Sequence, residues 1–253
     1  MKLAGRTILI TGATSGIGFE LAKQLVALGN TVVVTGRDPA KLAKFREMLP
    51  NAHALQSDVS DLSAIGMLYV TVTAQFPGLD TLINNAGIMR GLDLNAVRAS
   101  EGLTDEIDIN LKGPMRMVQQ FLPYLKTRPN ALIVNVSSAL AYVPLPTSPV
   151  YSASKAALHA YTRALRVQLR NTPVKVVELL PPAVDTPLIT QFANEMSGQK
   201  TMSPIDLARK AIEGIEGGRE EIRPGMSGLL MVLSRIAPHF ALQQMVKAFQ
   251  PKH

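Results

Sequence analysis

The chain has 253 residues, of which 47% are hydrophobic and 18% are charged; its formal net charge is +7, and it contains no cysteine. This composition excludes an intrinsically disordered chain, and the missing cysteine excludes disulfides, thiolate catalysis and cysteine-ligated metals. Lys and Arg form no run of five, so we expect no nucleic-acid partner and expect the positive charge to attract a small anionic molecule instead.

The first twelve residues contain an apolar run that is far too short for a signal peptide or a membrane span, so we expect a cytoplasmic protein. Similar short runs, rich in Val and Ile, follow along the chain. They lie at residues 7–11, 31–35, 52–56, 81–84, 132–137 and 175–180. Because they do not alternate with polar residues, they are typical of strands covered on both faces in a parallel sheet.

Segments with helical periodicity separate these runs. They lie at residues 19–29, 38–49, 61–76, about 101–126, 151–170 and 203–215. Strand–helix alternation of this kind predicts an α/β fold with a doubly wound parallel sheet and helices on both faces. No linker or repeat interrupts the pattern, so we expect residues 1–253 to form a single domain, with residues 225–253 as a helical C-terminal tail.

A glycine-rich turn follows the first strand. In ILITGATSGIGFELA, Gly12, Gly16 and Gly18 stand between a predicted strand and a predicted helix. Small residues at such a turn let the backbone approach a phosphate group, whose charge is stabilised by the helix N-terminus. We therefore predict that this turn binds a pyrophosphate-bearing ligand.

Six short motifs, spread in order along most of the chain, carry a resemblance to a known family. They are TGATSGIG at 11–18, SDV at 57–59, NNAG at 84–87, INLKG at 109–113, VSS at 136–138 and YSASK at 151–155. Together they resemble the short-chain dehydrogenase/reductase family. The resemblance implies a Rossmann-type sheet of about seven strands, nicotinamide-dependent carbonyl reduction or alcohol oxidation, and a homodimer or homotetramer. The runs PPAVDT and SRIAP further resemble a subgroup of oxidoreductases named after the lipoteichoic-acid D-alanylation locus.

The end of the second strand bears on the choice of cofactor. Gly36 stands where NAD-preferring relatives carry an acid, and the basic residue Arg37 follows. A basic side chain favours a 2′-phosphate, so we expect NADP(H), with NAD(H) possible. Asp38 is instead placed to cap the next helix. An exposed arginine without a ligand is the other interpretation of Arg37, and the second basic residue that many NADP-binding relatives carry in the glycine turn is absent.

The resemblance also implies a set of cofactor-binding residues. These are Gly12, Thr14, Ser15, Gly16, Ile17, Gly18, Arg37, Asp58, Val59, Asn85, Ala86, Gly87, Tyr151, Lys155, Pro181, Val184 and Thr186. Asp58 would accept a hydrogen bond from adenine, and a simple turn residue is an equally good interpretation of it.

Tyr151 precedes Lys155 by four residues in a predicted helix, which puts both side chains on one face, one turn apart. A nearby ammonium stabilises a phenolate, and the helix N-terminus and an oxidised nicotinamide would do the same. We therefore predict that the pKa of Tyr151 falls from about 10 toward neutrality, which suits a general acid in reduction and a general base in oxidation. Two ordinary surface residues are the alternative.

Two further residues complete the predicted catalytic set. Ser138 ends the fifth strand, where its hydroxyl can hold a substrate oxygen beside the phenol. Ser137 is its rival, but one residue earlier on a strand points to the other face. The resemblance gives Asn110 the role of binding a water that relays protons to Lys155, and gives Lys155 a second role on the nicotinamide ribose. A polar residue that kinks a helix explains Asn110 nearly as well.

No metal site is predicted, because the four histidines lack ligand spacing and no carboxylate cluster accompanies them. The predicted substrate pocket is mostly apolar, so we expect a small apolar carbonyl or alcohol as substrate. Its candidate residues are Met89, Leu140, Tyr142, Val143, Leu145, Val184 and Leu188. Residues 186–203 are predicted to form a mobile lid, within which residues 193–200 are disordered without ligand.

The apolar tail at residues 228–249 admits three interpretations, which we rank in this order: a cap over the substrate pocket, a subunit interface, and peripheral contact with a membrane. Taken together, the sequence predicts an NADP(H)-dependent oxidoreductase that transfers a hydride between the nicotinamide and an apolar carbonyl or secondary alcohol, with Tyr151 as acid and base. The alternatives are a non-catalytic dinucleotide-binding redox sensor and a membrane-surface protein. The presence of Ser138, Tyr151 and Lys155 together argues against the sensor.

Overall fold

Seven parallel strands form one sheet in the computed structural model, which describes residues 1–95, 102–190, 192 and 201–248. The strands are β1 (Thr7–Thr11), β2 (Thr31–Gly36), β3 (His53–Gln56), β4 (Leu79–Asn84), β5 (Leu132–Val136), β6 (Lys175–Leu179) and β7 (Glu221–Ile222). Their order across the sheet is β3-β2-β1-β4-β5-β6-β7. The predicted fold class is confirmed.

The winding of the chain reverses at β1, which pairs with β2 on one side and with β4 on the other. The connections that leave β1 and β4 therefore run to opposite faces of the sheet, and a crevice opens beyond the carboxyl ends of these two strands. Ligands of open α/β sheets bind in such a crevice. The predicted site residues outside the helices follow β1, β2, β3, β4, β5 and β6, so they share this edge of the sheet.

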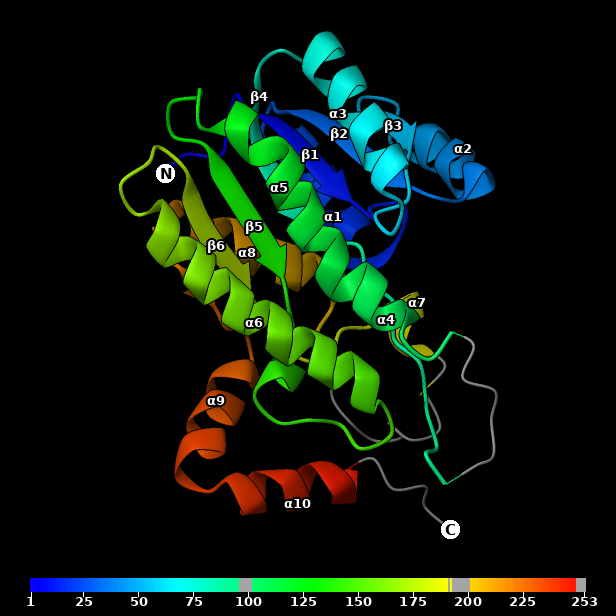
Figure 1. The fold of residues 1–253 in the computed structure, drawn as a ribbon, viewed down its shortest axis with the longest axis vertical. Coiled ribbons are helices and arrows are strands. Elements are labelled where there is room, and N and C mark those ends of the chain that lie inside the picture. Colours follow the sequence, from blue (N-terminus) through cyan, green and yellow to red (C-terminus); the bar gives the residue numbers. More distant parts are fainter. Residues whose placement is uncertain (96–101, 191, 193–200, 249–253) are drawn as a thin grey trace.

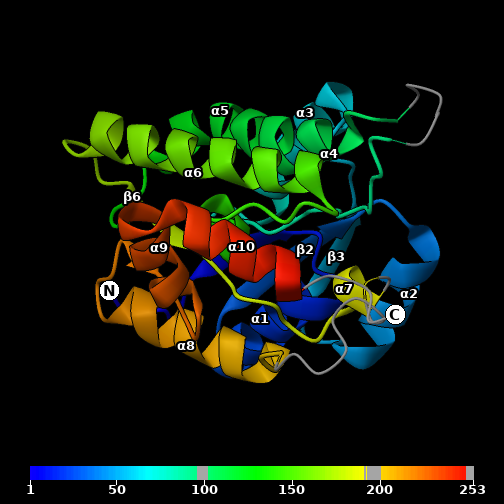
Figure 2. The ribbon, with the colours of Figure 1, turned by 90° about the horizontal axis from the view of Figure 1, so that it is seen from below.

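Helices cover both faces of the sheet (Figures 1 and 2). One face carries α3 (Leu62–Gln75), α5 (Gly113–Leu125) and α6 (Pro149–Leu169), and the other carries α1 (Gly16–Ala27), α2 (Pro39–Met48) and α8 (Pro204–Glu216). Along β1, Ile8 and Ile10 pack toward α1, α2 and α8, whereas Leu9 packs toward α3, α5 and α6. Burial on both faces is what the continuous apolar runs predicted.

The long helix predicted at 101–126 is divided in the structure. A single turn, α4 (Asp105–Ile107), passes into a π-helical turn at Asp108–Lys112 before α5 begins. Pro114 explains the wider turn, because it has no backbone N–H to donate to the carbonyl of Asn110 four residues earlier. The π-helical turn holds Asn110, which is fully buried.

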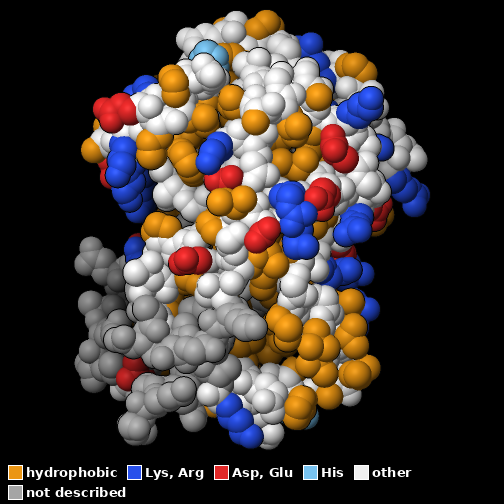
Figure 3. Space-filling view, turned by 180° about the vertical axis from the view of Figure 1, so that it is seen from behind, with side chains coloured by type: hydrophobic (Ala, Val, Ile, Leu, Met, Phe, Trp, Pro, Cys, Tyr) orange, Lys and Arg blue, Asp and Glu red, His pale blue; other side chains and the backbone are white. Residues whose placement is uncertain are grey.

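The C-terminal tail forms two helices, α9 (Ser227–Ile236) and α10 (Pro238–Ala248), which lie beyond the sheet below β5 and β6 in Figure 1. Figure 3 shows hydrophobic side chains gathered on the lower part of the molecule, where these helices lie. The exposed ones include Leu229, Val232, Ile236 and Phe240. Within the described part of the chain, no helix is long and apolar enough to cross a membrane. A short helix, α7 (Pro187–Thr190), follows β6.

Candidate active site

A cavity of about 720 Å³ opens at the carboxyl ends of the strands, and most of the predicted site residues line it. Those that do are Gly12, Thr14, Ser15, Gly16, Ile17, Arg37, Asp58, Val59, Asn85, Ala86, Gly87, Ser138, Tyr151, Lys155, Pro181, Val184 and Thr186. Gly18 and Asn110 lie behind the cavity wall, where each contacts residues that form it. The structure thus brings the predicted cofactor and catalytic residues to one cavity, and their individual roles stay predictions.

The glycine turn is built so tightly that side chains would not fit. Gly12 and Gly16 have φ values of 65° and 58°, in the left-handed region that favours glycine. A Cβ atom on Gly12 would lie 2.6 Å from Cα of Ala86. Helix α1 begins at Gly16, and its N-cap residue Ser15 makes no side-chain capping bond. The first N–H groups of α1 therefore face the cavity as donors for an anion.

Asn85 fastens this turn to β4. Its side-chain amide donates hydrogen bonds of 3.0 Å to the carbonyls of Thr11 and Gly12. In return, the Thr11 hydroxyl accepts hydrogen bonds from the backbone N–H groups of Asn85 and Ala86, both at 3.0 Å. Thr11 was not among the predicted site residues, although it opens the TGATSGIG motif. The NNAG motif therefore has a supporting role here, because it fixes the floor of the cavity.

Two exposed basic side chains, Arg37 and Lys41, border the cavity beyond β2. Lys41 was not predicted as a site residue. Its position four residues after Arg37, in the first turn of α2, could have indicated that it lies on the same side of the cavity. The Asp38 carboxylate accepts hydrogen bonds from the backbone N–H groups of Ala40 at 2.9 Å and Lys41 at 3.2 Å. Asp38 therefore caps α2, as predicted.

The contacts of Asp58 agree with its interpretation as a turn residue, and its contact with adenine stays a prediction. Its carboxylate accepts hydrogen bonds from the backbone N–H and the hydroxyl of Ser60, at 2.8 and 2.7 Å, so it shapes the turn after β3. Asp58 also lines the cavity beside Val59.

Tyr151 and Lys155 lie in the first half of α6, and both are buried. The Lys155 Nζ atom lies 5.6 Å from the centre of the Tyr151 ring and donates a 2.9 Å hydrogen bond to the carbonyl of Val136. The side chains of Tyr151 and Ser138 share a hydrogen bond. Ser137, the rival of Ser138, instead donates to the carbonyl of Lys155 at 3.2 Å. The phenol, the ammonium and the Ser138 hydroxyl therefore meet at one wall of the cavity.

Burial shifts the pKa values of these two groups in opposite directions. It raises the pKa of Tyr151 to about 12, against a smaller lowering by the hydrogen bond with Ser138. Burial also lowers the pKa of Lys155 to about 8, and the negative charge of Glu178 opposes this. The prediction that the pKa of Tyr151 falls is therefore wrong for the protein's own groups, since the loss of hydration outweighs the attraction of the ammonium.

Asn110 is held by backbone groups on the far side of the cavity wall. Its side-chain oxygen accepts a 2.9 Å hydrogen bond from the N–H of Ile88, and its amide donates to the carbonyl of Ile88 at 2.8 Å and to the Ser154 hydroxyl at 3.2 Å. A Cβ atom on Gly87 would lie 3.2 Å from Oδ1 of Asn110 and 3.7 Å from Nζ of Lys155. Asn110 thus braces the loop after β4 close to Lys155.

The rest of the cavity is walled by apolar side chains from the loops and from the tail. They include Met89, Leu140, Leu145, Val184, Leu188, Ile189, Met226, Leu230, Leu233 and Met245. Tyr142 and Val143, which we also predicted here, do not line it: Val143 packs in the apolar cluster behind Tyr151, and the Tyr142 hydroxyl accepts a hydrogen bond from Arg223. Helices α9 and α10 therefore form part of the wall, which agrees with the first-ranked interpretation of the tail.

Residues 193–200 of the predicted lid lie outside the described residues. At the base of that segment, Val184 and Met202 form an isolated parallel β-bridge. Among the residues that the structure describes, no group of three His, Cys, Asp or Glu side chains could hold a metal ion.

Comparison with known sequences agrees with the motifs. A family model described as short chain dehydrogenase matches residues 6–197. The chain is 42% identical over 227 residues to the uncharacterized oxidoreductase DltE of Bacillus subtilis, an alignment that covers 88% of this chain and 89% of the relative. It is 34% identical over 188 residues to an uncharacterized oxidoreductase of Staphylococcus epidermidis, which covers 74% of this chain and 81% of the relative.

Solved structures agree with the fold. A short chain dehydrogenase from Burkholderia cenocepacia, in complex with NADP, superposes with a TM-score of 0.83 at 24% identity, over 99% of this chain and 100% of the other. A 3-ketoacyl-(acyl-carrier-protein) reductase from Brucella melitensis, complexed with NADH, superposes with a TM-score of 0.76 at 29% identity, over 84% of this chain and 91% of the other. From its motifs, its sheet and these relatives, the chain belongs to the short-chain dehydrogenase family.

Proposed function

We propose that the protein is an NADP(H)-dependent oxidoreductase that transfers a hydride between the nicotinamide and an apolar carbonyl or secondary alcohol. One observation carries the proposal: the buried phenol of Tyr151, with Ser138 and Lys155, faces the same cavity as the glycine turn and the N-terminus of α1. A site that only sensed a dinucleotide would not need an acid–base group beside a hydroxyl and an ammonium.

The residues of the cavity fit a nicotinamide dinucleotide. The turn between Gly12 and Gly16 brings backbone close to the cavity, and the helix N-terminus behind it offers N–H donors to a pyrophosphate. The solved relatives hold NADP or NADH, which supports this class of cofactor. When bound, NADP(H) supplies or accepts the hydride.

Preference for NADP(H) over NAD(H) rests on charge. Arg37 and Lys41 border the end of the cavity where the second strand stops. The nearest carboxylate in the sequence is that of Asp38, and it caps α2. Two cations favour a 2′-phosphate, whereas NAD-binding sites of this fold use a free carboxylate on the ribose hydroxyls.

The catalytic proposal gives each polar group one task. Tyr151 donates its proton to the carbonyl oxygen in reduction, and its phenolate accepts a proton from the alcohol in oxidation. Ser138 hydrogen-bonds the same substrate oxygen and holds it next to the phenol. Lys155 lowers the energy of the phenolate by its charge, against the burial that raises the pKa of Tyr151 to about 12. Asn110 keeps the loop after β4 in place.

The substrate class follows from the apolar wall. Methionine and leucine side chains from the loops and from α9 surround the space beside Tyr151, so an apolar body with one carbonyl or hydroxyl group fits it better than a phosphorylated sugar does. The relatives at 42% and 34% identity are described as oxidoreductases, which supports the class of reaction.

The test is a screen of apolar ketones, aldehydes and secondary alcohols, in which the absorbance of NADPH reports turnover. With a substrate in hand, Tyr151→Phe should lower kcat by about a hundredfold or more, because the proton donor is lost. Tyr161→Phe is the matched control: Tyr161 lies on the same helix and does not line the cavity.

The variant should still bind NADPH nearly as well as the unchanged protein. If Tyr151→Phe turns over as fast as Tyr161→Phe, the acid–base assignment is wrong. If no compound in the screen is turned over while NADPH binds tightly, the redox sensor becomes the better explanation.

A further inference from the structure

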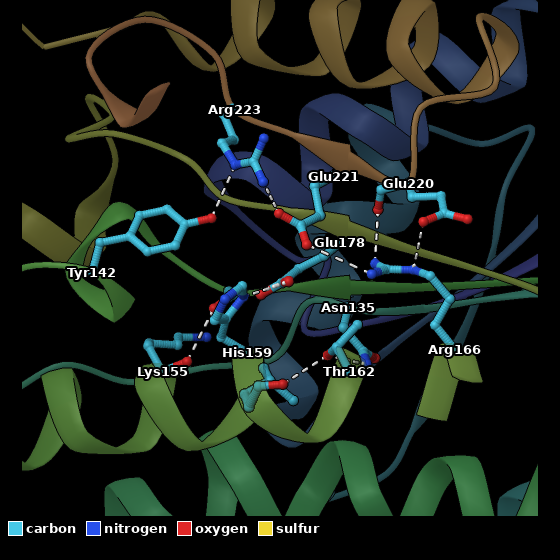
Figure 4. Close-up of polar contacts among 12 residues, drawn as sticks. Asn135, Tyr142, Lys155, His159, Thr162, Arg166, Glu178, Glu220, Glu221 and Arg223 are labelled. Carbon is cyan, nitrogen blue, oxygen red and sulfur yellow. Dashed lines mark hydrogen bonds and ion pairs between the residues drawn. The ribbon is translucent and has the colours of Figure 1, made fainter. Parts of the chain in front are cut away.

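Helix α6 carries a third titratable side chain, His159, on the same face as Tyr151 and Lys155. Unlike those two residues, His159 does not line the cavity. His159 follows Lys155 by four residues, and Thr162 follows by seven, so all four side chains share one face of the helix. Figure 4 shows Lys155, His159 and Thr162 pointing from α6 toward the strands.

Opposite this face, β6 carries a carboxylate in the interior of the protein. Glu178 is fully buried, and its Oε2 atom lies 2.8 Å from Nδ1 of His159. Its other oxygen, Oε1, is also buried and has no hydrogen-bond partner among the described residues. A buried carboxylate is costly unless a positive charge or several donors compensate it, so a single bond from His159 leaves its charge poorly compensated.

The register of the sheet brings this carboxylate next to the anchor of Lys155. Glu178 pairs with Asn135 on β5, and the next residue on β5 is Val136, whose carbonyl accepts the hydrogen bond from Lys155. The negative charge of Glu178 raises the pKa of Lys155 against the larger lowering by burial. The two opposite charges therefore lie within electrostatic reach of each other, with Lys155 in the cavity wall and Glu178 behind it.

The neighbouring cations have other partners. Arg166 donates to the carbonyls of Val176 and Glu220, and Arg223 donates to the Tyr142 hydroxyl and pairs with Glu221 (Figure 4). On the other side of Lys155, Tyr151 lines the cavity, and the charged group that acts on Tyr151 is Glu106 on α4. The negative charge of Glu106 raises the pKa of Tyr151 and so works against a phenolate.

We propose that Glu178, held by His159, is a positioning residue whose buried charge keeps Lys155 in its ammonium form beside Tyr151. The inference rests on the proposed function, since only an acid–base role of Tyr151 makes the charge of Lys155 matter for turnover. A lysine buried without such a counter-charge loses its proton at lower pH and then no longer favours the phenolate.

The decisive variant is Glu178→Gln, which keeps the shape of the side chain and removes its charge. Two measurements are made on the full chain: the titration of Lys155 by NMR with isotope-labelled lysine, its signal assigned with a Lys155→Met variant, and the pH profile of kcat/KM. We expect Lys155 to titrate on the order of one pH unit lower in Glu178→Gln, and the alkaline fall in kcat/KM to move down with it.

Thr162→Val is the matched control. It removes a buried hydrogen bond, from Asn135 at 2.9 Å, on the same face of α6, without changing any charge. It should lower stability and leave both the titration of Lys155 and the pH profile where they are. If Glu178→Gln does not fold, Glu178→Met removes the same charge with an apolar side chain of similar length, and the same shift is expected.

The inference is overturned if Lys155 titrates at the same pH in the folded Glu178 variant and in the unchanged protein. It is also overturned if the titration moves and the pH profile does not, or if Glu178→Gln and Thr162→Val lower kcat/KM equally at every pH, as a purely structural role would. Failure of the proposed function has a different signature: no turnover of any carbonyl or alcohol by the unchanged protein, with the NMR titration still deciding whether Glu178 acts on Lys155.

Discussion

The ammonium of Lys155 lies 5.6 Å from the centre of the Tyr151 ring, and its hydrogen bond goes to the carbonyl of Val136 and not to the phenol oxygen. The two side chains therefore interact through space, in a setting where both are buried. Burial disfavours an ammonium and a phenolate alike. The protein keeps both groups there at a cost in stability, which is a common property of acid–base sites.

Replacing the buried ammonium should change how stability depends on pH. The pKa of Lys155 is about 8, below its ordinary value of 10.5, so between these two values the unfolded chain binds a proton that the folded protein does not. The free energy of unfolding of the unchanged protein should therefore rise with pH in this window. Relative to Lys155→Met, the rise should be about 2 kcal/mol between pH 8 and 10, measured by urea denaturation at several pH values.

Lys175→Met is the control for that experiment, because Lys175 is exposed at the start of β6. Its free energy of unfolding should follow the pH dependence of the unchanged protein. If the free energy of unfolding depends on pH in the same way for Lys155→Met and for the unchanged protein, then burial does not lower the pKa of Lys155. Above pH 10 the raised pKa of Tyr151 acts in the opposite direction, since the unfolded chain loses the phenol proton first, so the comparison ends there.

The basic end of the cavity gives a prediction about cofactor choice. Arg37→Glu and Lys41→Glu should each weaken NADPH binding by about tenfold or more, because a charge-assisted hydrogen bond to the 2′-phosphate is replaced by repulsion. NADH, which lacks this phosphate, should be affected much less. Dissociation constants from the fluorescence of each reduced cofactor measure the difference.

Lys44→Glu separates this local effect from the loss of overall positive charge. Lys44 lies on the same helix as Lys41 and is exposed, but it does not line the cavity. It should change NADPH binding far less than Lys41→Glu does. Equal losses for NADPH and NADH in the Arg37 and Lys41 variants would show that the preference for NADP(H) is wrong.

Asn110 should matter for stability before it matters for chemistry. Asn110→Leu leaves the N–H and the carbonyl of Ile88 without their side-chain partners in a partly buried loop, so it should lower the free energy of unfolding by on the order of 3 kcal/mol. Ser138→Ala removes the acceptor for the N–H of Leu140 and the hydrogen bond with Tyr151, and it should lose activity with less loss of stability than Asn110→Leu. Thermal unfolding and initial rates on both variants distinguish these roles. Full stability in Asn110→Leu together with lost activity would favour the proton-relay interpretation instead.

The sheet could be predicted from the sequence because its strands are buried on both faces and so appear as continuous apolar runs. β7 has only two residues, Glu221 and Ile222, and its position is fixed by pairing with β6. No local sequence pattern therefore predicts it. The break in the helix at 101–126 had a visible cause, Pro114, but a proline near a helix start is equally compatible with a regular first turn. Only the packing of Asn110 against Ile88 decides between the two.

In the candidate site, too, some features could be predicted from local sequence and others could not. The glycine turn and the pair Tyr151 and Lys155 could be predicted because their chemistry depends on residue type and on spacing along one element. The direction of the pKa shift of Tyr151 could not, because it depends on how much water the folded chain removes from the phenol. The tail helices were identified, but which of their side chains face the cavity follows from packing between distant segments.

Two neighbouring leucines in α9 test whether the tail forms the substrate wall. Leu230 lines the cavity, whereas Leu229 is 48% exposed on the outer side of the helix. Leu230→Gln places an amide in the apolar wall, so it should raise KM for an apolar substrate by about tenfold, the effect of losing most of one buried leucine contact, and leave the dissociation constant of NADPH unchanged. Leu229→Gln makes the same chemical change without touching the cavity, so its kinetics should match the unchanged protein. Equal kinetics for the two variants would remove α9 from the substrate site and leave a subunit interface or a membrane surface as the role of the tail.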